Sequence, residues 1–174
     1  MLTKGNEMGV EKKYFPMYMD LSKKKVLFVG AGNIALRRIK SLADFCLEIA
    51  VIAQSIPKET KSEIQRLVDT GVITIQIKAF EREDIECGVD IVIAATDDAK
   101  TNAYVRECCK TISLSGQEIL VNVVSDKELC DFYFPAIVQA KDVVIGIAGN
   151  GETHSKTKKV AEKIRAFIKS GERA

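Results

Sequence analysis

The chain has 174 residues, of which 47% are hydrophobic and 29% are charged. This length accommodates one ordinary domain with a small addition, and this composition is typical of a folded globular protein. A net charge of +2 argues against a nucleic-acid partner, and no apolar run reaches the length of a membrane span. The five cysteines are odd in number and lack metal-binding spacing, which favours reduced thiols in a cytoplasmic protein.

The first twenty residues contain two different segments. Residues 1–13 are polar and hold no apolar signal core, so we expect a loose leader. Residues 14–21 are rich in aromatic side chains and methionines, and Pro16 keeps them extended. We expect Tyr14 and Phe15 to pack into the core at the edge of the first strand; the alternative is contact with a substrate.

Residues 25–42 predict a strand, a tight turn and a helix, because an apolar run stops at glycines and apolar residues then recur at helical spacing. The turn fits the pattern G-x-G-x-x-G/A that binds dinucleotides, with Gly30, Gly32 and Ala35 at the small positions. Gly30 permits the turn, and Gly32 lets a pyrophosphate approach the free amides of the helix. We predict a nucleotide-binding loop; the alternative is a purely structural turn.

A second buried strand is predicted at residues 47–53. Dehydrogenases with this loop usually place an acidic residue after that strand, where it holds a ribose hydroxyl. Gln54 and Ser55 stand there instead and can still hydrogen-bond the ribose. Without a carboxylate to repel a 2′-phosphate, this position leaves both NAD and NADP open.

Strands and helices continue to alternate up to residue 124. We expect a helix at 58–70, a strand at 72–77, a short turn or helix at 83–86, a strand at 89–95, a helix at 99–110 and a strand at 119–124. This alternation predicts an α/β fold, a doubly wound parallel sheet of the Rossmann type.

Polar residues lie at the carboxyl ends of two of these strands. Thr96 and Asp97 follow the strand at 89–95, which in such a sheet ends beside the nucleotide loop, so both can face the cofactor. Thr96 or Asp97 can also cap the next helix, and capping is the competing role for Asp97 and Asp98. Asn122 interrupts the strand at 119–124, where a nicotinamide carboxamide or the backbone can supply its partners.

The alternation stops near residue 128. Two apolar stretches within residues 131–148 predict a β-hairpin with an aromatic face, and a lone hairpin needs covering, which predicts a homodimer. A loop containing His154 leads into an amphipathic helix ending near Lys169; we expect His154 at the surface, and the alternative is a ligand or an acid. We therefore predict two domains: a Rossmann NAD-binding domain at residues 1–128, and a dimerisation hairpin with a short C-terminal helix at residues 129–174.

Five stretches occur in an order that carries a family resemblance. They are YFPMYMDL, VLFVGAGNIALRR, DIVIAATDD with Asn102, LVNVVSD and FYFPAIV. Together they resemble precorrin-2 dehydrogenase, the NAD-binding region of siroheme synthases, from residue 14 to about residue 151. The resemblance implies an NAD-dependent enzyme that oxidises the tetrapyrrole precorrin-2 to sirohydrochlorin, and some members of the family then insert iron.

The resemblance also implies site residues. It assigns NAD contacts to Asn33, Ile34, Gln54 and Ser55. Bifunctional members have a catalytic aspartate directly after N-V-V, where this chain has Ser125. Serine is no carboxylate base at neutral pH, so that role passes to Asp126, is shared with water, or is not needed for oxidation.

Two further departures concern iron insertion. The glycine-rich loop near the C-terminus reads GNGETHS, and one helix follows it where the family has a longer helical region. We therefore expect a dehydrogenase without efficient ferrochelatase activity, without a metal site, and without a nucleic-acid or membrane partner. The competing functions are a non-catalytic NAD-binding regulatory module, and a truncated relative that binds tetrapyrrole or metal without turnover.

Overall fold

The computed structural model describes residues 15–85, 88–114, 116–149 and 154–171. The chain divides into two compact units. The sheet unit is Met19–Phe134, and the hairpin unit combines residues up to Tyr18 with those from Pro135 onward. The predicted leader and Tyr14 lie outside the described residues, and the division into domains at residues 128 and 129 stays a prediction.

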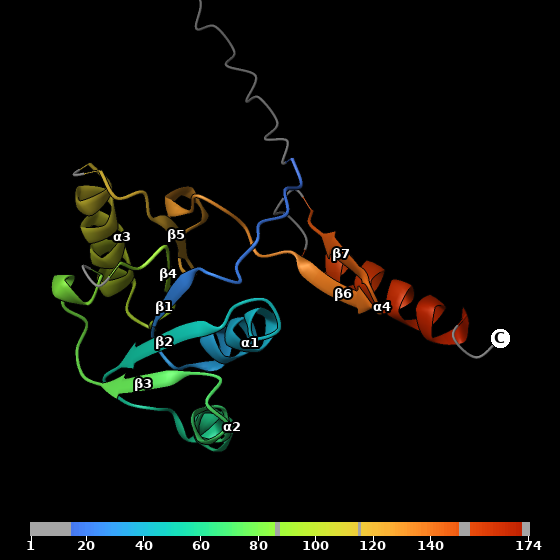
Figure 1. The fold of residues 1–174 in the computed structure, drawn as a ribbon, viewed down its shortest axis with the longest axis horizontal. Coiled ribbons are helices and arrows are strands. Elements are labelled where there is room, and N and C mark those ends of the chain that lie inside the picture. Colours follow the sequence, from blue (N-terminus) through green and yellow to red (C-terminus); the bar gives the residue numbers. More distant parts are fainter. Residues whose placement is uncertain (1–14, 86–87, 115, 150–153, 172–174) are drawn as a thin grey trace, which may run out of the picture. The chain divides into compact units, whose positions relative to one another are not determined.

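The sheet unit is built on five parallel strands (Figure 1). They are β1 Lys25–Val29, β2 Glu48–Ala53, β3 Thr74–Ile77, β4 Ile91–Ala94 and β5 Leu120–Val123. Their order is β3-β2-β1-β4-β5, and every neighbouring pair is parallel. The direction of the order reverses between β1 and β4, which creates a switch point at their carboxyl ends. The predicted Rossmann-type sheet is confirmed.

Helices cover both faces of this sheet (Figure 1). Helices α1 Asn33–Leu42 and α2 Lys58–Asp69 pack on one face, and α3 Ala99–Leu114 packs on the other. Adjacent strand residues therefore enter different cores: Phe28 lies on the α1 side and Leu27 on the α3 side, both buried. Burial on both faces explains why these strands read as continuous apolar runs. No helix within the described ranges is both long and apolar enough to cross a membrane.

The hairpin unit contains two antiparallel strands and one helix. Strands β6 Ala136–Ala140 and β7 Val143–Ile147 form the hairpin, and α4 His154–Gly171 packs against both. In the described part of this unit only Val138 and Ala161 are buried apolar residues. The unit therefore has almost no core of its own.

The structure corrects three expectations about these segments. The predicted aromatic face of the hairpin is wrong, because Phe132 and Phe134 belong to the sheet unit and pack against the core beside α1. The predicted packing of Phe15 is also wrong, since 88% of this residue is exposed. His154 is the first residue of α4 rather than part of a loop.

Candidate active site

The first glycine of the predicted nucleotide loop, Gly30, lies in close contact with the backbone that follows β4. Gly30 follows β1 with a positive φ of 113°, and its amide donates to the carbonyl of Ile52 at 2.8 Å. A Cβ added to Gly30 would lie 2.4 Å from the carbonyl oxygen of Ala95. Only glycine fits this turn, which joins the ends of β1, β2 and β4.

The second glycine has open space instead. Gly32 precedes α1 with an ordinary φ of −77°, and a Cβ built on it would meet no atom within 4 Å. Asn33 and Ile34 begin the helix and are exposed, and the first turn contains no acidic residue. Free amides at a helix start, with open space before them and no repelling charge, fit a pyrophosphate.

A buried threonine holds this loop in place. Thr60 on α2 is fully buried, and its hydroxyl donates to the carbonyl of Ala31 at 2.8 Å. Sequence reasoning missed this contact, because it treated residues 58–70 only as an amphipathic helix. A polar residue on the inward face of that helix is the signal that could have revealed it.

Gln54 and Ser55 lie where the sequence predicts them. Both directly follow β2 and are exposed. The hydrogen bond from the Gly30 amide to the carbonyl of Ile52 ties the end of β2 to the glycine loop. The two side chains are therefore accessible at the same edge of the sheet, where a nucleotide ribose binds in folds of this type.

A buried asparagine joins the loops after β4 and β5. Asn102 on α3 is fully buried, and its amide nitrogen donates to the carbonyl of Thr96 at 3.0 Å and to Ser125 Oγ at 3.2 Å. Its oxygen accepts from the Thr96 amide at 3.0 Å and from the Thr96 hydroxyl at 2.8 Å. Asn102 thus brings two predicted site residues together. Sequence reasoning noted Asn102 as part of a motif but gave it no role.

The two acidic residues after Thr96 differ in their hydrogen bonds. Asp98 caps α3, since its carboxylate accepts from the amides of Lys100 and Thr101 and from the Thr101 hydroxyl, which lowers the pKa of Asp98. The expectation that Asp97 or Asp98 caps this helix is therefore confirmed for Asp98, and the expectation that Thr96 or Asp97 is the cap is wrong. Asp97 is exposed between Thr96 and the cap.

Ser125 and Asp126 follow β5, and both are exposed. Because the Asn102 amide occupies one lone pair of Ser125 Oγ, the Ser125 hydroxyl keeps its proton for another acceptor. Asp126 Oδ1 accepts from the Glu128 amide at 2.9 Å, so Asp126 caps the short 3₁₀ helix η2 Lys127–Leu129. That bond fixes the Asp126 carboxylate at the loop.

Asn122 is placed apart from this group. It is 2% exposed on the α1 side of the sheet, its oxygen accepts from Arg38, and its amide donates to the carbonyl of Phe132 at 2.7 Å. Protein groups thus supply the partners that a nicotinamide was expected to supply. Of the two roles considered for Asn122, these contacts favour the internal one.

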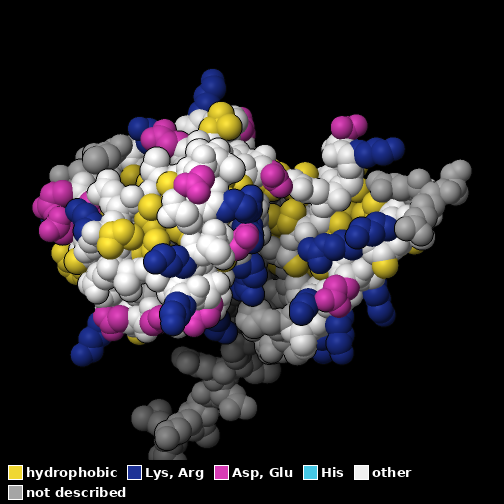
Figure 2. Space-filling model, turned by 90° about the horizontal axis from the view of Figure 1, so that it is seen from below, with side chains coloured by type: hydrophobic (Ala, Val, Ile, Leu, Met, Phe, Trp, Pro, Cys, Tyr) yellow, Lys and Arg dark blue, Asp and Glu magenta, His cyan; other side chains and the backbone are white. Residues whose placement is uncertain are grey.

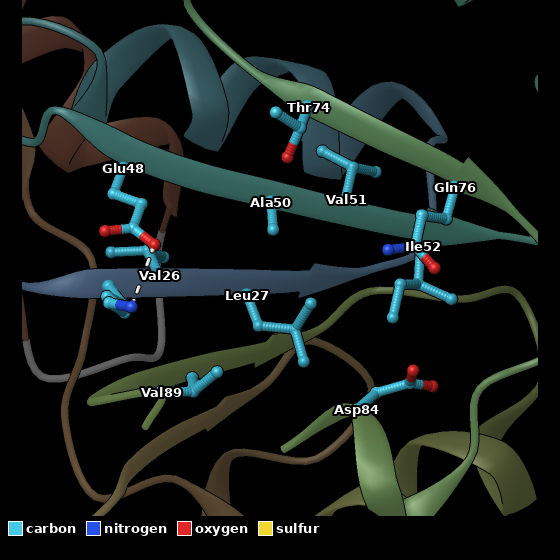
Figure 3. Close-up of a pocket in the computed structure, with 11 residues that line it drawn as sticks. Val26, Leu27, Glu48, Ala50, Val51, Ile52, Thr74, Gln76, Asp84 and Val89 are labelled. Atoms are coloured by element: carbon cyan, nitrogen blue, oxygen red, sulfur yellow. Dashed lines mark ion pairs between the residues drawn. The ribbon is translucent and has the colours of Figure 1, made fainter. Parts of the chain in front are cut away.

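A hollow of about 180 Å³ lies elsewhere on the sheet unit (Figure 3). Its lining includes Leu27, Ala50 and Val89, with the ion pair of Lys25 and Glu48 at the start of β1 and β2. None of the predicted site residues lines this hollow. Most of the predicted residues instead lie in the loops after the strands, while Asn33 and Ile34 begin α1 and Asn122 lies within β5.

The described cysteines are free thiols: Cys46, Cys108, Cys109 and Cys130. Burial raises the pKa of Cys109 to about 12, so this thiol is unreactive at neutral pH. Within the described ranges no group of three or more His, Cys, Asp or Glu residues could hold a metal ion.

Comparisons with known proteins agree with this geometry. The chain is 38% identical over 152 residues to the "Probable multifunctional siroheme biosynthesis protein HemA" of Ruminiclostridium josui, and 34% identical over 155 residues to the "Siroheme synthase" of Actinobacillus pleuropneumoniae serotype 3 (strain JL03). These alignments cover 87% and 89% of this chain but only 28% and 30% of the relatives. The chain thus spans less than a third of their length.

The fold is also found in a solved structure. "SirC, precorrin-2 dehydrogenase" matches with a TM-score of 0.70 at 23% identity, over 91% of this chain and 76% of that one. A family model described as "Putative NAD(P)-binding" matches residues 17–136. This range contains the glycine loop and the loops that Asn102 joins. The chain belongs to this NAD(P)-binding family.

Proposed function

We propose that the chain is an NAD-dependent dehydrogenase that oxidises precorrin-2 to sirohydrochlorin in siroheme biosynthesis. The observation that carries the proposal is the junction of the glycine loop at Gly30 with the loops that hold Thr96 and Ser125. The names of the relatives, which refer to siroheme synthesis and precorrin-2, support this substrate.

The cofactor residues have distinct tasks. The amides at Gly32, Asn33 and Ile34 face the pyrophosphate, and Gln54 and Ser55 hydrogen-bond the ribose. Neither Gln54 nor Ser55 carries the positive charge that recognises a 2′-phosphate, which favours NAD over NADP. When bound, NAD supplies the hydride acceptor.

The loops after β4 and β5 complete the reaction site. Thr96 and Asp97 border the nicotinamide end, and Asn102 orients Ser125. Oxidation removes a hydride and a proton from the macrocycle, and the exposed Asp126 carboxylate or water accepts that proton. Ser125 contributes a hydrogen bond that helps to orient the substrate.

Iron insertion is inefficient in this proposal. A chelatase must accept the pyrrole protons as the metal enters, and an ionised carboxylate does this while binding a hard cation transiently. Ser125, at the position of the family's aspartate, has neither property. Wild-type protein given sirohydrochlorin and ferrous iron without oxygen should form siroheme no faster than the uncatalysed mixture; clearly faster formation would refute this part.

A second copy of the chain completes the hairpin unit. In its described part the unit buries only Val138 and Ala161, while Val143, Val160 and Phe167 are 56%, 46% and 77% exposed. Packing on one helix with so small a core leaves a two-stranded hairpin only marginally stable in water. We therefore include a homodimer in the proposal, located in the cytoplasm and without a nucleic-acid or membrane partner.

The charge of α4 suits a substrate with several carboxylates. Six Lys or Arg side chains and one Glu belong to this helix, and Figure 2 shows basic side chains gathered in this part of the chain. An excess of positive charge raises the local concentration of a polyanion.

Anaerobic incubation of the purified chain with precorrin-2 and NAD tests the proposal. We expect NADH to form, and we expect Gly32→Val, whose side chain fills the pyrophosphate space, to form none while remaining folded. Absence of NADH from wild-type protein that binds NAD would refute the proposed reaction.

A further inference from the structure

The guanidinium of Arg38 is held rigidly on the α1 side of the sheet. Its Cζ lies 4.7 Å from the centroid of the Phe134 ring, and Nη1 donates to Asn122 Oδ1. Asn122 is itself fixed, because its amide donates to the carbonyl of Phe132 at 2.7 Å. The Phe134 ring on one face of the guanidinium and the Asn122 amide at its edge therefore fix the plane of this cation.

Arg38 differs from the other partly buried arginine of the sheet unit. Arg106 donates from both terminal nitrogens to Asp131, at 2.7 Å from Nη2, and this hydrogen bond raises the pKa of Arg106. Arg38 makes no ion pair with any described residue. Burial lowers the pKa of Arg38 to about 10, and the neighbouring Arg37 adds repulsion. Arg38 is thus a cation at neutral pH that lacks a counter-charge among the described residues.

The remaining donors of Arg38 are accessible. A guanidinium has five N–H groups, and the described residues accept one hydrogen bond from Arg38. No buried side-chain nitrogen or oxygen among the described residues lacks a partner. Nε and Nη2, which have no partner among the described residues, are therefore not fully buried, and a fixed planar fork matches the two oxygens of a carboxylate.

The position of Arg38 separates it from the pyrophosphate site. Arg38 is five residues from the start of α1, which is about 7.5 Å along the helix axis. Its partner Asn122 precedes Ser125 by three residues, which span at most about 10 Å because the chain turns after β5. An anion on Arg38 therefore lies on the β5 side of the sheet unit, within one macrocycle's width of Ser125.

We propose that Arg38 is a binding residue for a carboxylate on the rim of the macrocyclic substrate, with Phe134 and Asn122 holding its guanidinium in place. This inference rests on the proposed function, since the acetate and propionate groups of such a tetrapyrrole supply the anion. A bidentate carboxylate would replace the water lost from the buried cation and fix the register of the macrocycle against Ser125.

Binding of uroporphyrin, a stable tetrapyrrole with eight carboxylates, tests this role without turnover. Arg38→Gln removes the charge but keeps an amide, and we expect its Kd for uroporphyrin to rise about 10- to 100-fold, the loss of a hydrogen bond to a charged group. Arg38→Lys keeps the charge but lacks the planar fork, so its Kd for uroporphyrin should lie between those of wild type and Arg38→Gln. Arg106→Gln is the control: it breaks the ion pair with Asp131 elsewhere on the sheet unit and should leave the Kd within about twofold of wild type.

The same variants in the oxidation assay separate the two proposals. We expect Arg38→Gln to raise the KM for precorrin-2 about 10- to 100-fold, with a smaller change in kcat and an unchanged Kd for NAD. If both Arg38 variants bound uroporphyrin with wild-type affinity, the inference would be overturned. Arg38 would then serve only to hold Phe134 in place. Arg38-dependent uroporphyrin binding without oxidation of precorrin-2 would instead uphold this site and refute the proposed reaction.

Discussion

The two glycines of the nucleotide loop should respond in opposite ways to substitution. In Gly30→Ala the new Cβ lies 2.4 Å from the Ala95 oxygen, and the residue must keep a φ of 113° that L side chains rarely adopt. Backbone strain of about 1–3 kcal/mol and overpacking of about 1–3 kcal/mol together predict a loss of about 2–6 kcal/mol in the free energy of unfolding. Because the clash is with backbone, no rotamer change relieves it.

Gly32→Val is the matched variant. The φ of Gly32 is −77° and nothing lies within 4 Å of its Cβ position, so we expect the free energy of unfolding to change by less than about 1 kcal/mol. The valine side chain would occupy the space for the pyrophosphate and weaken NAD binding by at least about 100-fold.

Urea unfolding followed by circular dichroism, and calorimetric titration with NAD, measure the two effects on the same preparations. We expect Gly30→Ala to be less stable than wild type, and Gly32→Val to be stable but unable to bind NAD. Wild-type stability of Gly30→Ala would show that β1 and β4 do not approach as described. Wild-type NAD affinity of Gly32→Val would show that the pyrophosphate lies elsewhere.

Four further predictions concern other parts of the chain. Asn102→Ala removes the four partly buried hydrogen bonds of this side chain, so it should lower the free energy of unfolding by about 1–3 kcal/mol in urea titrations and reduce kcat more than NAD affinity. Ser125→Ala should keep most of the NADH formation and Asp126→Ala should lose more of it; the reverse order would assign the proton to Ser125. The hydrogen bond from Lys24 lowers the pKa of Asp90 below its ordinary 3.8, so it stabilises the fold above that pH, and the stability gap between wild type and Asp90→Asn should shrink as the pH falls from about 5 to about 3. Light scattering should give the mass of a dimer at micromolar concentration, and a stable monomer would refute the argument from the hairpin unit.

The sequence predicted the sheet unit well because its signals are local. Each buried strand is a short apolar run, each helix shows apolar spacing, and the glycines mark the turn after β1. Helix ends were less accurate, and α3 continues to Leu114 because Ile112 still packs in the core. The choice of Asp98 as the cap depends on backbone geometry that spacing alone does not fix.

The parts that sequence reasoning missed are long-range polar contacts. Thr60 meets the glycine loop 29 residues away, and Asn102 meets Ser125 23 residues away. A polar residue on an apolar helix face signals such a contact but does not name its partner. The aromatic residues at 132–134 were given to the hairpin because they adjoin it in sequence, whereas the apolar surface beside α1 binds them.

A single-turnover reaction tests the proposed activity most directly. Excess enzyme with limiting precorrin-2 and NAD, kept free of oxygen and iron, should form one NADH for each sirohydrochlorin, with both followed by absorbance. Gly32→Val under the same conditions should form neither product. Sirohydrochlorin formed without NADH, or no product from wild-type protein with bound NAD, would contradict the account.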